Sequence, residues 1–180
     1  YHMPFVSNHQ LKRMWDRTLH VSPLAGPIDR LSRRLPGGAA HTVRWPDGGP
    51  GDVNGLYTRV PAHLSFTDAE QRKGKAGLRA LGIHEGTPFV CFHARASAYE
   101  DYKGHGQVYH NKFRDSTIHN YVKAAESLAQ RGYFAIRMGH IVTETLETNN
   151  PRVIDYATEG RTDFLDIYLS ANCRFFLSGG

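Results

Sequence analysis

A histidine, an arginine and a serine follow one apolar stretch of the chain at alternate positions. In "PFVCFHARAS", residues 88–97, four apolar residues lead into His93, Arg95 and Ser97. A guanidinium group is a permanently charged planar donor that matches phosphate oxygens, and imidazole and hydroxyl groups add further hydrogen-bonding atoms. The stretch therefore predicts an anion-binding site where a buried strand ends. The alternatives are a core histidine for His93 and a surface ion pair for Arg95.

Three further apolar stretches end in residues that could also bind a phosphorylated ligand. The predicted strands 133–138, 153–156 and 173–177 end in arginine, aspartate and Ser-Gly-Gly, respectively. Ligands of open parallel sheets bind beyond the carboxyl ends of the strands, so we expect these groups to line one crevice. Arginines and turn amides would hold phosphate, and the aspartate would accept from sugar hydroxyls. The predicted binding residues are His93, Arg95, Ser97, Arg137, Gly139, Asp155, Ser178, Gly179 and Gly180.

Two of these assignments have structural alternatives of their own. Arg137 could pair with Asp155 as a bridge that contacts no ligand, and the terminal Gly-Gly could be a simple turn. All four strand ends together predict a binding site, because a buried strand seldom ends in an unpaired arginine.

Helices alternate with these strands and position them. Apolar residues recur at helical spacing in residues 7–19, 67–82, 117–131 and 162–171. Thr67 and Glu70 form the sequence of a capping box, Ser7 or Asn8 could cap the first helix, and Asp115 or Ser116 the third. Alternating strands and helices predict an α/β fold with a parallel, Rossmann-like sheet. Residues 21–61 are rich in proline and glycine, and we expect little regular structure there.

Composition limits the classes of protein that fit. The 180 residues include 22 Lys and Arg against 17 Asp and Glu, a mild excess of +5 with no block dense enough for nucleic acid. No apolar run reaches membrane-spanning length. Cys91 and Cys173 both lie in apolar runs, so we expect two reduced, buried thiols. No dinucleotide, P-loop or nucleophile-elbow motif appears, and the histidines at 105 and 110 have no metal-site spacing.

Several stretches, taken in order, resemble a family of bacterial glycosyltransferases. They include "LPGGAAH", "PAHLSFTDAE", "FVCFHARASAY", "FRDSTIHNY", "RGYFAIRMG" and "DFLDIYLSANCRFFLSGG". The resemblance implies the GT-B type, in which two Rossmann-like domains face each other and the C-terminal one holds a nucleotide-sugar donor. The His-x-Arg motif is also similar to that of GDP-fucose-dependent fucosyltransferases, which implies that Arg95 contacts the diphosphate with His93 beside it.

The resemblance also implies a domain plan and a reaction. Residues 1–61 would be the end of an acceptor-side domain, and residues 62–180 the first part of a donor-binding domain, both cut from a longer chain. The expected enzyme is a metal-independent hexosyl or fucosyl transferase without a cofactor, inactive as this piece alone. It would move sugar from a nucleotide sugar to a glycan or lipid-linked glycan in surface polysaccharide synthesis. We expect a cytoplasmic protein, which could also be peripheral at the inner face of the membrane.

The sequence departs from the family pattern at one position and leaves one role open. Ala96 stands where the resembled pattern has an aspartate, so no acidic catalytic group is expected there. The general base stays unassigned, since His41 and His63 cannot be placed from the sequence. Residues 98–114 form either a substrate loop or an insertion. The alternative function is a non-catalytic module that binds a nucleotide sugar or phosphate.

Overall fold

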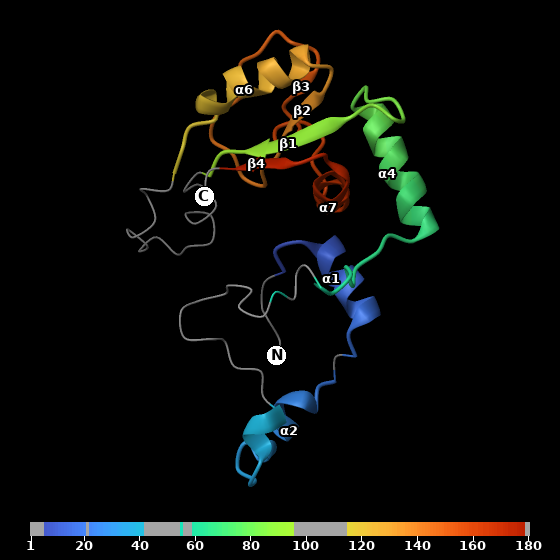
Figure 1. Ribbon diagram of the computed structural model, residues 1–180, viewed down its shortest axis with the longest axis vertical. Helices are drawn as coiled ribbons and strands as arrows, with labels where there is room; N and C mark the ends of the chain where they lie inside the picture. Colours follow the sequence, from blue (N-terminus) through green and yellow to red (C-terminus); the bar gives the residue numbers. More distant parts are fainter. Residues whose placement is uncertain (1–5, 21, 42–54, 56–58, 96–114, 179–180) are drawn as a thin grey trace. The chain divides into compact units, whose positions relative to one another are not determined.

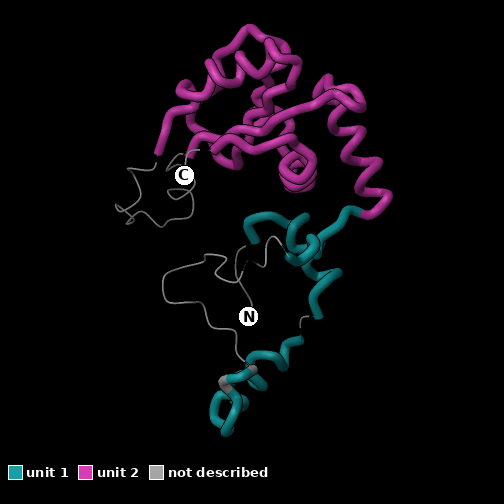
Figure 2. Tube along the Cα trace, viewed as in Figure 1, with its two compact units in different colours: residues 1–66 teal, residues 67–180 magenta. Residues whose placement is uncertain are grey.

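The chain divides into two compact units, Tyr1–Phe66 and Thr67–Gly180 (Figure 2). The computed structural model describes residues 6–20, 22–41, 55, 59–95 and 115–178. The predicted loop 98–114 and three predicted binding residues, Ser97, Gly179 and Gly180, lie outside these ranges. The structure divides the chain at residue 66, but it does not show what either unit binds. The assignment of an acceptor-side and a donor-binding domain therefore stays a prediction.

The first unit contains α1 (His9–Thr18), α2 (Ala25–Ser32) and a 3-10 turn η1 (Gly38–His41). The Asn8 side chain accepts a hydrogen bond from the Leu11 amide at 2.8 Å, which caps α1 as the sequence indicated. The expectation of little regular structure after residue 21 is wrong for α2. Pro27 lies in the first turn of α2, where a missing N–H removes no helical hydrogen bond, so proline does not prevent this helix.

The second unit is built on a four-stranded, fully parallel sheet, which confirms the predicted α/β, Rossmann-like fold class. The strands are β1 (Phe89–His93), β2 (Phe134–Arg137), β3 (Val153–Ile154) and β4 (Phe176–Ser178), in the order β3-β2-β1-β4. Two predicted bounds were wrong. β3 has only two residues, and β4 begins three residues after Cys173 because that residue ends the preceding helix.

Helices cover both faces of the sheet, and the core has one layer on each side (Figure 1). Val90 and Phe92 of β1 face α6 (His119–Gln130), where they pack with Ile118 and Ala125. The alternate residues Phe89 and Cys91 face the other side, which holds α4 (Asp68–Ala80) and α7 (Asp163–Asn172). This alternation follows from the two-residue period of a strand, and it explains why β1 is apolar throughout.

Two glycines allow α4 and α7 to pack closely. A Cβ atom on Gly74 would lie 2.1 Å from the Tyr168 ring, and one on Gly77 would lie 2.4 Å from Leu165. Glycine costs an exposed helix about 1 kcal/mol relative to alanine, so both residues weaken α4 locally. Because these two residues have no side chains, Tyr168 and Leu165 of α7 can lie close against α4. The predicted capping box of α4 is present, with Glu70 bonded to the Thr67 amide at 2.8 Å.

The two cysteines lie in different surroundings. Cys91 is fully buried in β1, and burial raises the pKa of its thiol. Cys173 is only half-buried, because it is the C-cap of α7 and not a strand residue. The expectation that both thiols are buried is wrong for Cys173, and the expectation that both are reduced stays a prediction.

Candidate functional site

The strand order reverses between β1 and β4, and this place defines the candidate site. From β1 the chain proceeds outward to β2 and β3, and then returns to place β4 on the opposite side of β1. The helix that follows β1 and the helix that precedes β4 therefore cover opposite faces (Figure 1). Connections that diverge in this way leave a crevice at the carboxyl ends of the two strands, where ligands of such sheets bind.

His93 and Ser178 are neighbours at this crevice. They are paired residues in the register of β1 and β4, and both are the last residues of their strands. His93 is partly buried. This burial, together with the positive charges of Arg137 and Arg95, holds the pKa of the imidazole below its usual range. His93 is therefore a neutral imidazole near pH 7, able to donate from one ring nitrogen and accept at the other.

Arg95 lies two residues beyond β1 and remains accessible. Its side chain is 27 % exposed, and its Nε lies 3.7 Å from Oδ1 of Asp115, too far for a good hydrogen bond. The Arg95 carbonyl accepts from the Ser116 amide at 2.9 Å. These two contacts join residue 95 to residues 115 and 116.

Arg137 is placed very differently. Its side chain is only 4 % exposed, and Nη1 donates to Asp155 Oδ2 at 3.0 Å. The same oxygen accepts from the Leu146 amide at 2.9 Å, whereas the buried Oδ1 has no hydrogen-bond partner among the described residues. This pairing favours the alternative in which Arg137 and Asp155 form a structural bridge, and it anchors the segment that joins β2 to β3.

Gly139 follows β2 in a crowded position. A Cβ atom there would lie 2.6 Å from Cγ1 of Val142 and 3.3 Å from the Ala157 side chain. The glycine thus lets the chain after β2 pack against the chain after β3. Of the nine residues predicted to bind, the structure pairs His93 with Ser178 at the carboxyl ends of β1 and β4, and Arg95 lies two residues beyond His93. The other three described residues contact protein groups near β2 and β3: Arg137 pairs with Asp155, and Gly139 is enclosed by Val142 and Ala157.

Glu144 occupies the N-terminus of α6, the helix that follows β1. Its Oε2 accepts from the Thr117 hydroxyl at 2.8 Å and from the Ile118 amide at 3.3 Å, and these bonds lower the pKa of the carboxyl. The cap expected from Asp115 or Ser116 is absent from α6, whose N-cap residue Ile118 makes no side-chain bond. An acidic side chain therefore sits where many Rossmann folds bind phosphate, and its negative charge disfavours an anion at the start of α6.

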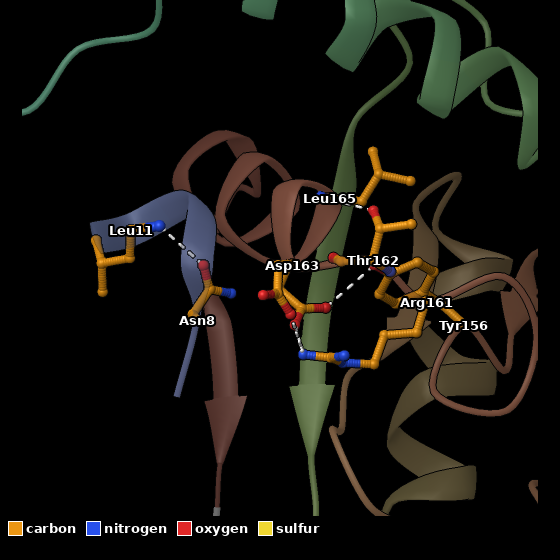
Figure 3. A network of polar contacts seen from close by, with 8 residues as sticks. Asn8, Leu11, Tyr156, Arg161, Thr162, Asp163 and Leu165 are labelled. Atoms are coloured by element: carbon orange, nitrogen blue, oxygen red, sulfur yellow. Dashed lines mark hydrogen bonds and ion pairs between the residues drawn. The ribbon is translucent and has the colours of Figure 1, made fainter. Parts of the chain in front are cut away.

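A second polar network joins the end of β3 to the start of α7 (Figure 3). The Tyr156 hydroxyl accepts from the Thr162 amide at 2.9 Å and lies 3.1 Å from Oδ1 of Asp166. Arg161 pairs with both Asp163 and Asp166. Burial raises the pKa of Tyr156 and of Asp166, so the tyrosine stays protonated as a donor.

Sequence reasoning missed Glu144 and the Tyr156 network for different reasons. Glu144 lies 26 residues from the amide it caps, so no local motif reveals it. The Thr162 side chain bonds the Leu165 amide at 3.2 Å, and a threonine followed by an acidic turn is a readable cap signal. The partner of that cap, Tyr156, could have been noticed directly after the predicted Asp155.

Comparisons with protein-family models, curated proteins and solved structures returned no match, so the chemistry of the site is argued from its geometry. Within the described ranges, no three His, Cys, Asp or Glu residues gather as metal ligands. No helix in those ranges is long and apolar enough to cross a membrane.

Proposed function

We propose that this chain binds the diphosphate of a nucleotide sugar at the β1–β4 crevice and forms the donor-binding part of a glycosyltransferase. One observation carries the proposal. His93 and Arg95 follow the central strand at the point where the strand order reverses, beside Ser178 of β4. An accessible guanidinium and two neutral polar groups at such a place suit a phosphorylated ligand.

In the proposed reaction these groups stabilise the departing nucleoside diphosphate. The bond between the sugar and the diphosphate breaks while the acceptor hydroxyl bonds to the sugar, and negative charge grows on the leaving phosphate. Arg95 would contact that charge, and preorganised donors of this kind lower the barrier most where charge develops. The acceptor, a glycan or lipid-linked glycan at the cytoplasmic side, would meet residues of another domain. The general base stays unassigned, and His63 is an exposed residue of the first unit.

A non-catalytic nucleotide-binding module is the alternative, and Ala96 is the observation that favours it. The resembled glycosyltransferases carry an acidic residue at this position, and this chain carries none there. A binding module would hold the nucleoside diphosphate through the same residues without cleaving the sugar bond.

A thermal-shift screen with UDP, GDP, ADP and CMP tests the binding step. A ligand at 100 times its dissociation constant stabilises the folded state by about 2.7 kcal/mol, which raises Tm by several degrees for a chain of this size. We expect one nucleoside diphosphate to produce such a shift and the Arg95→Ala variant to lose it. The matched control is Arg79→Ala, which removes an exposed arginine of α4.

Release of nucleoside diphosphate from the matching nucleotide sugar separates the two functions. Turnover with a glycan acceptor by the chain joined to its acceptor-side domain supports the transferase. Binding without turnover in that protein supports the binding module. The absence of a shift with every nucleotide and nucleotide sugar would contradict both.

A further inference from the structure

We propose that His93 is a proton-linked phosphate-binding group, which is neutral in the unliganded chain and gains a proton from solvent when a doubly charged phosphate binds beside Arg95. This inference rests on the proposed function, and it names the ligand chemistry that the site selects. The site would favour diphosphates over singly charged anions, because only a multiply charged ligand would make protonation of His93 favourable.

The position of the imidazole is the first support. His93 ends the central strand between β2 and β4, with Arg137 next to Phe92 in the β1–β2 register and Ser178 opposite in β4. Both arginines already have carboxylate partners, Asp155 for Arg137 and Asp115 for Arg95. Within the described part of the chain, the imidazole itself makes no hydrogen bond or ion pair.

The charges around His93 explain why it lacks a proton without ligand. Arg95 from its own segment and Arg137 from β2 both oppose a positive imidazole, and partial burial opposes it further. The carboxylates nearby are committed elsewhere: Asp155 accepts from Arg137 and Leu146, and Asp115 faces Arg95. Glu144 accepts from Thr117 and Ile118 at the start of α6, and β4 contributes only the uncharged Ser178.

A bound diphosphate reverses this balance. Opposite charge within a few ångströms favours the protonated form, and a protonated imidazole has two N–H donors where the neutral ring has one. Phosphate binding and protonation of His93 then strengthen each other by the same factor, because linkage is reciprocal. Affinity for the ligand should rise as pH falls, by at most tenfold for each pH unit when one proton is taken up.

Calorimetric titration with inorganic pyrophosphate tests this linkage. Heats measured at pH 7 in buffers of different ionisation enthalpy give the number of protons gained on binding. Phosphate groups themselves titrate near neutral pH, so the value for His93→Gln is subtracted. We expect the full chain to gain close to one proton more than His93→Gln, and His84→Gln, an exposed histidine ahead of β1, to match the parent.

A pH titration of the His93 ring carbon by NMR provides a second, direct readout. With saturating pyrophosphate the midpoint should move upward by more than one pH unit, and His84 should not move. Tight binding with no difference in proton uptake between the parent and His93→Gln would overturn this inference and leave the proposed function standing. Failure of the parent chain to bind either pyrophosphate or a nucleoside diphosphate would overturn both.

Discussion

Arg137 is the last residue of β2 and Arg95 lies two residues beyond the neighbouring strand β1, yet the two guanidinium groups have very different surroundings. Arg137 is 4 % exposed and donates to Asp155 at 3.0 Å, whereas Arg95 is 27 % exposed and lies 3.7 Å from Asp115. Both residues are arginines near the carboxyl end of a strand. The difference lies in the carboxylate that the fold brings to each: Asp155, directly after β3, for Arg137, and Asp115, ahead of α6, for Arg95.

The two arginines should therefore have different roles in the protein. A buried charge must be paired within the protein, and removal of its partner leaves an uncompensated charge in a poor solvent. Arg95 is 27 % exposed, and a 3.7 Å ion pair at a partly exposed site contributes little stability, so a ligand phosphate can replace Asp115 at small cost. Arg137 should therefore govern stability, and Arg95 should govern binding.

The largest expected effect is on stability. Arg137→Met leaves Asp155, a mostly enclosed carboxylate with a buried Oδ1, without its cation, so we expect the free energy of unfolding to fall by up to about 3–5 kcal/mol. Urea denaturation followed by circular dichroism measures this loss. The double variant Arg137→Met, Asp155→Leu should recover part of it, with the Leu146 amide still deprived of its acceptor. Equal stability of the parent and Arg137→Met would remove the distinction between the two arginines.

The next effect is on binding. Arg95→Ala should weaken pyrophosphate binding more than tenfold, because a hydrogen bond to a charged group is worth on the order of 2 kcal/mol. Its stability should stay within about 0.5 kcal/mol of the parent, as is usual for a partly exposed side chain. Calorimetry and urea denaturation on the same variant check both halves. A sharp drop in stability with unchanged affinity would make Arg95 another structural bridge.

A packing variant shows whether binding merely follows stability. Gly74→Ala forces a methyl group against the rigid ring of Tyr168, and overpacking of this kind costs about 1–3 kcal/mol. Gly77→Ala meets the flexible end of Leu165, so its cost should be smaller. Both should bind pyrophosphate like the parent while folded. Weaker binding by Gly74→Ala would mean that affinity depends on the whole unit and not on Arg95.

The smallest effect concerns Glu144 and appears only as a pH dependence. Its pKa is lower in the folded chain, so its contribution to stability is complete above the unfolded pKa, about 4.3, and is lost as pH falls through the folded value. Glu144→Gln should be less stable than the parent at pH 7, and the two should converge only once the pH has fallen below the folded-state pKa of Glu144. Urea denaturation at a series of pH values measures this. A constant gap across that range would contradict a role for the carboxylate charge.

The sequence was sufficient where local patterns determine structure. Thr67 with Glu70, Asn8 ahead of α1, and the apolar run of β1 each act within a few residues, and each was predicted. The same alternation of strands and helices predicted the parallel sheet. Prediction failed for α2, because the proline and glycine content of residues 21–61 argues against helix, although a proline in the first turn does not disrupt one.

Features that depend on residues far apart in the sequence could not be predicted. The choice between ligand contact and bridge for Arg137 depends on Asp155, 18 residues later, and the cap of α6 depends on Glu144. The strand order was likewise beyond a local pattern, because a parallel sheet of four strands can be arranged in several ways. The observed order has β4 beside β1, and this pairing puts His93 and Ser178 side by side.

That strand order also has a consequence for folding kinetics. β1, β2 and β3 follow one another in the chain and lie next to one another in the sheet, whereas β4 must return to the far side of β1. Closing this long loop is slow, because its entropy is lost before the strand contacts compensate. We expect β4 to dock last, so that His93 meets Ser178 only in the final folding step. A ligand at that junction would slow unfolding more than it speeds folding.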